Sequence, residues 1–155
     1  MNDEVLIVIE KEYPSHYWRG IANKDFICDF RLNAAAFQFD DTIREDGFKE
    51  LSINWNDSDE ALITVLSQKK ANGKLQFSVG AAKLELSKTK QFLSAYIERE
   101  EFNYERRPIE GNEYHGNLLV KASIDKRTRA LVSHTLALIA DTNITYQTNS
   151  KEEQI

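Results

Sequence analysis

Apolar and polar residues alternate through residues 51–55, and this alternation constrains the fold more than any other local feature. Leu51, Ile53 and Trp55 occupy every second position, with Ser52 and Asn54 between them. Successive side chains of a β-strand point to opposite faces of its sheet. The segment is therefore predicted to be a strand with one apolar face, which requires a sheet and a layer of other elements to cover that face.

Three helices are predicted. The first starts near Asp57 or Ser58, whose side chains can accept hydrogen bonds from free backbone N–H groups, and ends at Asn72-Gly73. The second is expected to begin at Ser87 and the third, the longest, at Asp125. The apolar residues expected to face the core are Leu62, Val65 and Leu66 in the first helix, Phe92, Leu93, Tyr96 and Ile97 in the second, and Leu131, Val132, Leu138 and Ile139 in the third.

Four more strands are predicted from apolar runs or alternation. Residues 5–9 are apolar on both faces, which is typical of an inner strand. In residues 26–32, Cys28 would share the apolar face with two phenylalanines as an inert small hydrophobe. Residues 75–86 change phase near Gly80, which suggests a bulge, and residues 118–122 form the last strand.

This order of elements predicts an α+β fold. We expect a mixed or mostly antiparallel sheet of about five strands with three helices packed on it. The length of 155 residues suits one domain, predicted to span residues 1–149, and residues 150–155 are predicted to be a short solvated tail.

The composition favours some classes of protein over others. The net charge of −5 makes nucleic acid an unlikely partner by expectation, because nucleic-acid binders usually present a basic surface. Cys28 is the single cysteine, so an internal disulfide cannot form. The chain shows no signal-peptide pattern, and its longest apolar run, residues 5–9, is far shorter than the roughly 20 residues of a membrane helix. We expect a cytoplasmic protein without membrane contact.

No strong catalytic or cofactor motif is present in the sequence. Neither a glycine-rich phosphate loop nor a metalloprotease or serine-hydrolase signature occurs. His16, His115 and His134 are too far apart for a recognisable metal motif, and the acidic residues 40–46 are interpreted as a solvated loop. We therefore predict no cofactor and no metal site.

Our leading hypothesis is an accessory protein that binds a protein partner or forms a homo-oligomer. Tyr17, Trp18 and Arg19 are predicted to lie in a loop, and aromatic residues beside an arginine are typical of an interface centre. Trp18→Ala is then expected to weaken complex formation while leaving the melting temperature nearly unchanged.

The alternative is a small enzyme or nucleotide-binding domain that acts on a phosphate-containing substrate. Arg19 would hold the anion and His115 would act as the general acid or base, which requires both side chains in one pocket. Two other charged segments have simpler interpretations. Residues 99–107 carry charges that largely cancel, as in a salt-bridged helix end, and the cations Lys126, Arg127 and Arg129 at a helix start are offset by Asp125.

Overall fold

The computed structural model describes residues 13–29, 31–140 and 144–147. Its main element is a six-stranded sheet in the order β6-β7-β4-β1-β5-β8, in which every pair of neighbouring strands is antiparallel. The strands are β1 (His16–Ile21), β4 (Phe48–Trp55), β5 (Gly80–Glu85), β6 (Phe102–Arg106), β7 (His115–Lys121) and β8 (Ile144–Tyr146).

Within these described residues there are three α-helices, α2 (Glu60–Ser67), α3 (Leu86–Leu93) and α4 (Lys126–Ala140). Short 3-10 helices lie at Lys24–Phe26 (η1), Ala34–Phe37 (η2) and Arg99–Glu101 (η3), and β2 (Ile27–Cys28) pairs with β3 (Arg31–Leu32) in a separate small sheet. The predicted α+β class is confirmed, with a mostly antiparallel sheet that has one strand more than expected.

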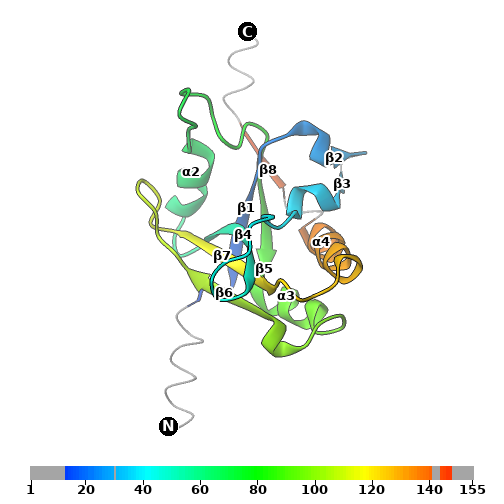
Figure 1. Ribbon diagram of the computed structural model, residues 1–155. Helices are drawn as coiled ribbons and strands as arrows, with labels where there is room; N and C mark the ends of the chain where they lie inside the picture. Colours follow the sequence, from blue (N-terminus) through cyan, green and yellow to red (C-terminus); the bar gives the residue numbers. More distant parts are fainter. Residues whose placement is uncertain (1–12, 30, 141–143, 148–155) are drawn as a thin grey trace.

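Helices cover both faces of the sheet, with α2 on one side and α4 on the other (Figure 1). Under α3 and α4 lies the main core, which contains Tyr17 and Trp55. Under α2 lies a smaller cluster that contains Trp18 and Tyr114. Adjacent residues of β1 therefore belong to different cores, because successive side chains of a strand point to opposite faces.

Two local predictions are confirmed in detail. Residues 51–55 lie in β4, and Leu51, Ile53 and Trp55 are all buried in the main core. The longest helix begins directly after Asp125, whose carboxylate accepts a hydrogen bond of 2.7 Å from the backbone N–H of Thr128. That bond lowers the pKa of Asp125, and the carboxylate also suits the positive end of the helix.

The predicted loop at residues 16–20 is wrong, because this segment is β1, a central strand of the sheet. Tyr17 is 1% exposed and Trp18 is 6% exposed. The alternation was hidden because both faces of β1 are covered, so apolar side chains occupy adjacent positions, and because the polar Arg19 interrupts the run. The strand that we expected at residues 5–9 lies outside the described residues.

The strand predicted over residues 26–32 is also wrong. The chain makes the η1 turn and then a two-residue hairpin, which reverses at Asp29 with a φ of 53°. Short polar residues such as aspartate tolerate this left-handed conformation better than most, so it favours a turn over a continuous strand. Cys28 is consequently exposed, and its placement on a buried apolar face is wrong.

The other elements differ from prediction in extent or in orientation. Only the second half of residues 75–86 is a strand, and residues 99–107 form η3 and β6 rather than a helix end. The first helix ends at Ser67, not at Asn72-Gly73, and Ser58 accepts a hydrogen bond of 3.3 Å from the N–H of Glu60. Of the apolar helical residues expected to point inward, four are exposed: Phe92, Tyr96, Leu131 and Leu138.

Candidate ligand-binding cleft

The structure places Arg19 against backbone carbonyl groups. Its Nε donates to the carbonyl oxygen of Ala36 at 2.9 Å, and its Nη1 donates to that of Ser52 at 2.8 Å. In β1, Tyr17 and Trp18 are the residues paired with β4. The guanidinium of Arg19 therefore connects the two strands just beyond their last paired residues. Burial lowers the pKa of Arg19 to about 10. These bonds identify a structural role for Arg19 at this junction.

The two neighbouring aromatic residues also have partners inside the fold. The hydroxyl of Tyr17 donates to Thr89 Oγ1 at 3.1 Å and lies 3.0 Å from the hydroxyl of Tyr104. The indole Nε1 of Trp18 donates to Asn56 Oδ1 at 3.1 Å. The structure thus places Tyr17 and Trp18 in the two cores, and the solvent-exposed aromatic patch expected for a partner is not formed by these residues.

His115 opens β7 on the opposite side of the sheet from Arg19. Arg19 shares a face with Tyr17, and Tyr17 is paired with Trp55 of β4. His115 is paired with Asn54, the residue before Trp55 in β4. Paired residues share a face and consecutive residues do not. The structure therefore does not bring the Arg19 and His115 side chains together in one pocket.

A network of charged and amide groups lies on the same face as His115. Arg44 binds both carboxylate oxygens of Glu105, at 2.6 Å and 3.2 Å, and Asn117 Nδ2 donates to Glu105 Oε2 at 2.7 Å. Desolvation favours the neutral form of Glu105, but these hydrogen bonds outweigh it and lower the pKa of that carboxyl. Arg44 also pairs with Asp46 and Glu50, so one guanidinium is shared by three carboxylates.

A cleft with a volume of about 740 Å³ lies between α3 and the edge strand β6. This volume lies in the range of about 300–1,000 Å³ that is usual for small-molecule sites. We call it the α3–β6 cleft. Its lining combines residues from α3 and the turn after it, from η3 and β6, and from the segment before β1: Tyr13, Ser87, Lys90, Gln91, Ser94, Arg99, Phe102, Asn103 and Tyr104.

One wall of the α3–β6 cleft is polar. It is formed by residues at positions i, i+3, i+4 and i+7 along the chain: Ser87, Lys90, Gln91 and Ser94. Positions with this spacing lie on one face of a helix. The adjacent face of α3 carries the buried Leu86, Thr89 and Leu93, so the packing of this face on the core determines which face of the helix lines the cleft.

The other wall is aromatic and rigid. Tyr13 donates its hydroxyl to the backbone oxygen of Tyr104 at 3.0 Å, and the Tyr104 N–H donates to Asn103 Oδ1 at 2.9 Å. The Tyr13 ring also stacks on Trp55 with a centroid separation of 4.5 Å. These contacts hold the Tyr13 ring in a fixed position. The backbone carbonyl and N–H of Tyr104 are both hydrogen-bonded to side chains, those of Tyr13 and Asn103.

The charge of the cleft differs from that of the whole chain. Among the residues that the structure describes, the charged ones in the lining are Lys90 and Arg99, with no aspartate or glutamate. The chain as a whole carries a net charge of −5. A concave site with one sign of charge concentrates the field of that charge at its centre. The arrangement is suited to an anion that also presents a flat ring to the aromatic wall.

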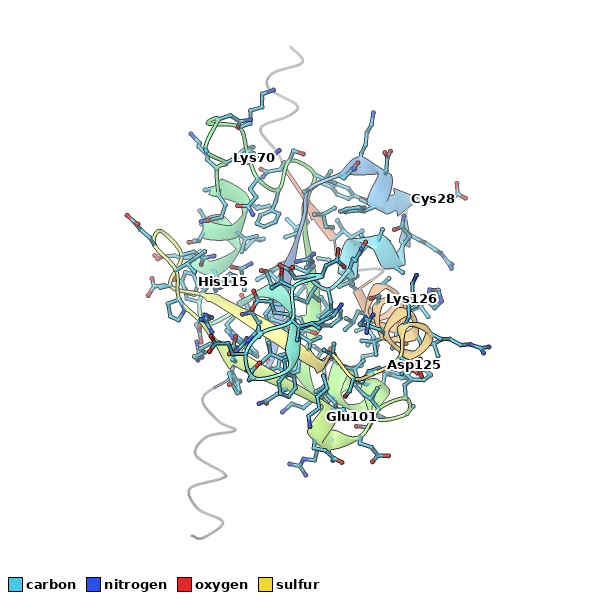
Figure 2. All side chains as sticks on the ribbon, in the orientation of Figure 1. Cys28, Lys70, Glu101, His115, Asp125 and Lys126 are labelled. Carbon is cyan, nitrogen blue, oxygen red and sulfur yellow. The ribbon has the colours of Figure 1, made fainter. Side chains whose placement is uncertain are left out.

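The structure shows no cluster of metal-ligating side chains in the residues that it describes, and no helix there is long and apolar enough to cross a membrane. Figure 2 labels His115 and Glu101 near opposite ends of the β6–β7 hairpin, so the cleft beside η3 and the His115 region are separate. No protein-family model matches the chain, and no match was found among curated proteins or solved structures.

Sequence analysis missed the α3–β6 cleft. The polar stripe that begins at Ser87 was available as a signal, since it is the complement of the buried face of α3. Its significance depended on the residues opposite it. The sequence pattern favours a helix end for the segment that contains Arg99 and Asn103, whereas η3 and β6 place these two residues across from α3.

Proposed function

We propose that the protein is a small binding protein whose α3–β6 cleft takes an anionic molecule with an aromatic ring, such as a nucleoside monophosphate. The observation that carries the proposal is the lining itself, whose described residues place two cations and no carboxylate beside an aromatic wall. A phosphate placed between Lys90 and Arg99 would receive charge-assisted hydrogen bonds. A base would lie against the aromatic wall, where Tyr13 is half-buried and Phe102 and Tyr104 are buried, and contact with aromatic rings is favourable and sequence-tolerant.

The hydroxyl and amide groups of α3 support the same ligand class. Ser87 and Gln91 lie one turn apart on the polar wall. The Ser87 hydroxyl donates to Glu85 Oε1 at 2.7 Å and offers an acceptor, and the Gln91 amide offers donors and an acceptor for a sugar hydroxyl. A few polar groups of this kind in a partly apolar cleft are typical of sites for small molecules. This proposal keeps the phosphate-containing ligand of the alternative hypothesis but assigns it to other residues than Arg19 and His115.

Calorimetric titration with adenosine 5′-monophosphate tests the proposal, with adenosine and inorganic phosphate as partial ligands. We expect the monophosphate to bind more tightly than either part. Lys90→Gln should weaken its binding at least tenfold, because a charge-assisted hydrogen bond contributes about 1.5–3 kcal/mol and about 1.4 kcal/mol corresponds to a factor of ten. Lys88→Gln is the matched control, because Lys88 is on the same helix but does not line the cleft.

Two results would overturn the proposal. Equal affinity of the wild-type protein and Lys90→Gln for the monophosphate would place the ligand elsewhere. Failure of the monophosphate, a phenyl phosphate and an aromatic carboxylate to bind at millimolar concentration would show that the cleft is not a site for this ligand class.

A protein partner or a homo-oligomer remains a prediction. Tyr17 and Trp18, which prompted it, lie in the cores, so the contact residues would have to be others. Native mass spectrometry of the protein purified at its natural level tests this prediction. A stoichiometric protein partner would support an interaction function, and a monomer that carries a small anion would support the cleft proposal instead.

A further inference from the structure

Ser52 and His115 form a hydrogen-bonded pair on the outer face of the sheet. The distance between Ser52 Oγ and His115 Nε2 is 3.3 Å, and that between His115 Nδ1 and the carbonyl oxygen of Arg107 is 2.8 Å. Ser52 is exposed and His115 is half-buried. The two residues come from adjacent strands, β4 and β7, and are diagonal neighbours in their register.

These contacts determine the protonation of the neutral imidazole. A backbone carbonyl oxygen can only accept, so Nδ1 must carry the hydrogen and donate it to Arg107. Nε2 then presents its lone pair, and the Ser52 hydroxyl donates to it. A serine nucleophile is activated when its hydroxyl donates to an imidazole whose other nitrogen donates to a fixed acceptor. Here the fixed acceptor that orients the imidazole is the backbone carbonyl of Arg107.

We propose that Ser52 is a nucleophile, with His115 as its general base, toward small carboxylic esters. In the first step Ser52 Oγ attacks the carbonyl carbon as its proton passes to Nε2. The carbon–oxygen bond to the leaving group then breaks, and Nε2 returns the proton to the leaving alkoxide. Water, deprotonated by Nε2, attacks the acyl-serine, and the proton returns to Ser52 as the acid leaves.

The surroundings support this role for the pair. Both residues lie on central strands, which hold their backbones more rigidly than loops do. The carboxylates nearest in the register, Glu50 and Glu105, are engaged by Arg44 and Asn117, and none is hydrogen-bonded to the imidazole. The pair also lies apart from the α3–β6 cleft, so the inference does not depend on the proposed function.

Covalent labelling with diisopropyl fluorophosphate tests the inference. Attack by Ser52 Oγ on phosphorus displaces fluoride, and the hydroxyl proton passes to His115, so the product is a stable phosphoryl-serine. We expect one adduct per chain, located at Ser52 by peptide mass spectrometry.

Variants and internal controls make the test decisive. Ser52→Ala should abolish the adduct, and His115→Gln should slow labelling about 100-fold, within the range measured for general bases. Ser78 and Ser94 are matched control serines, because each donates its hydroxyl to a backbone carbonyl, at 3.0 Å and 2.8 Å, and neither hydroxyl contacts a base there.

Hydrolysis of p-nitrophenyl acetate should follow the same order of variants. Labelling that is spread evenly over Ser52, Ser78 and Ser94, or a His115→Gln rate equal to that of the wild-type protein, would overturn the inference. Because Ser52 is exposed and His115 is half-buried, circular dichroism should show both variants folded.

Discussion

Replacing Trp18 by alanine separates the sequence-based interpretation from the structural one. As an interface residue in a loop, Trp18 could be truncated without loss of stability. In the structure its indole is 6% exposed and packs with Ala61, Val65, Ala81 and Tyr114 between the sheet and α2. Trp18→Ala should therefore empty a large part of this smaller core.

The magnitude follows from what the indole contacts. Truncation of a buried aromatic side chain to alanine costs about 3–5 kcal/mol of the free energy of unfolding, from lost burial and the remaining cavity. Lys83 Nζ lies 5.6 Å from the centre of the ring, a cation–π contact that adds about 0.5–1 kcal/mol. For a domain of this size, about 4 kcal/mol corresponds to a decrease of roughly 8–16 °C in melting temperature.

Urea unfolding followed by circular dichroism, together with a thermal melt, measures this effect. Trp18→Phe should keep much of the packing and lose less stability than the alanine variant. Phe92→Ala is the matched control, since Phe92 is 44% exposed on α3 and its truncation should cost under about 1 kcal/mol. A Trp18→Ala protein within about 0.5 kcal/mol of the wild type would refute the placement of this indole in the core and restore it as a contact residue.

Three other perturbations follow from the structure. Gly116→Ala would place its Cβ against the carbonyl oxygen of Glu105 and the indole Nε1 of Trp55. We therefore expect urea unfolding to show a free energy of unfolding that is lower by about 1–3 kcal/mol, and an unchanged midpoint would contradict this packing. Burial raises the pKa of Tyr17 to about 12, so the neutral phenol stabilises the fold fully below about pH 10, and this contribution is lost between about pH 10 and 12. Over that interval the stability of Tyr17→Phe should fall less than that of the wild-type protein. Identical alkaline unfolding curves for the two proteins would disprove the assignment. Asp57→Asn breaks the 2.7 Å ion pair with Arg106, in which both side chains are about one third exposed. A thermal melt should therefore show a loss of stability below about 1 kcal/mol, and a larger loss would mean that the pair is more strongly coupled than its exposure indicates.

The candidate sites could be predicted only in part. His115 was singled out from the sequence, but its partner Ser52 is 63 residues away, and no local pattern indicates that β4 and β7 are neighbours. Arg19 was singled out as an anion clamp, whereas the fold directs its donors to two carbonyl groups. A sequence shows which side chains are chemically capable, but their partners depend on the order of the strands.

The sequence by itself determined those elements whose signals are local. The alternation at residues 51–55 and the cap at Asp125 depend on side chains a few positions apart, and both are present in the structure. The class of fold follows from the order of such elements, and it is confirmed as well.

Tertiary structure decided the features in which distant segments meet. β1 is covered on both faces and β6 is a charged edge strand, so neither shows the simple alternation of a half-buried strand. Their pairing within the sheet compensates for weak local preferences through hydrogen bonds and buried aromatic rings. The α3–β6 cleft and the Ser52–His115 pair exist only because that pairing brings together residues that the chain keeps apart.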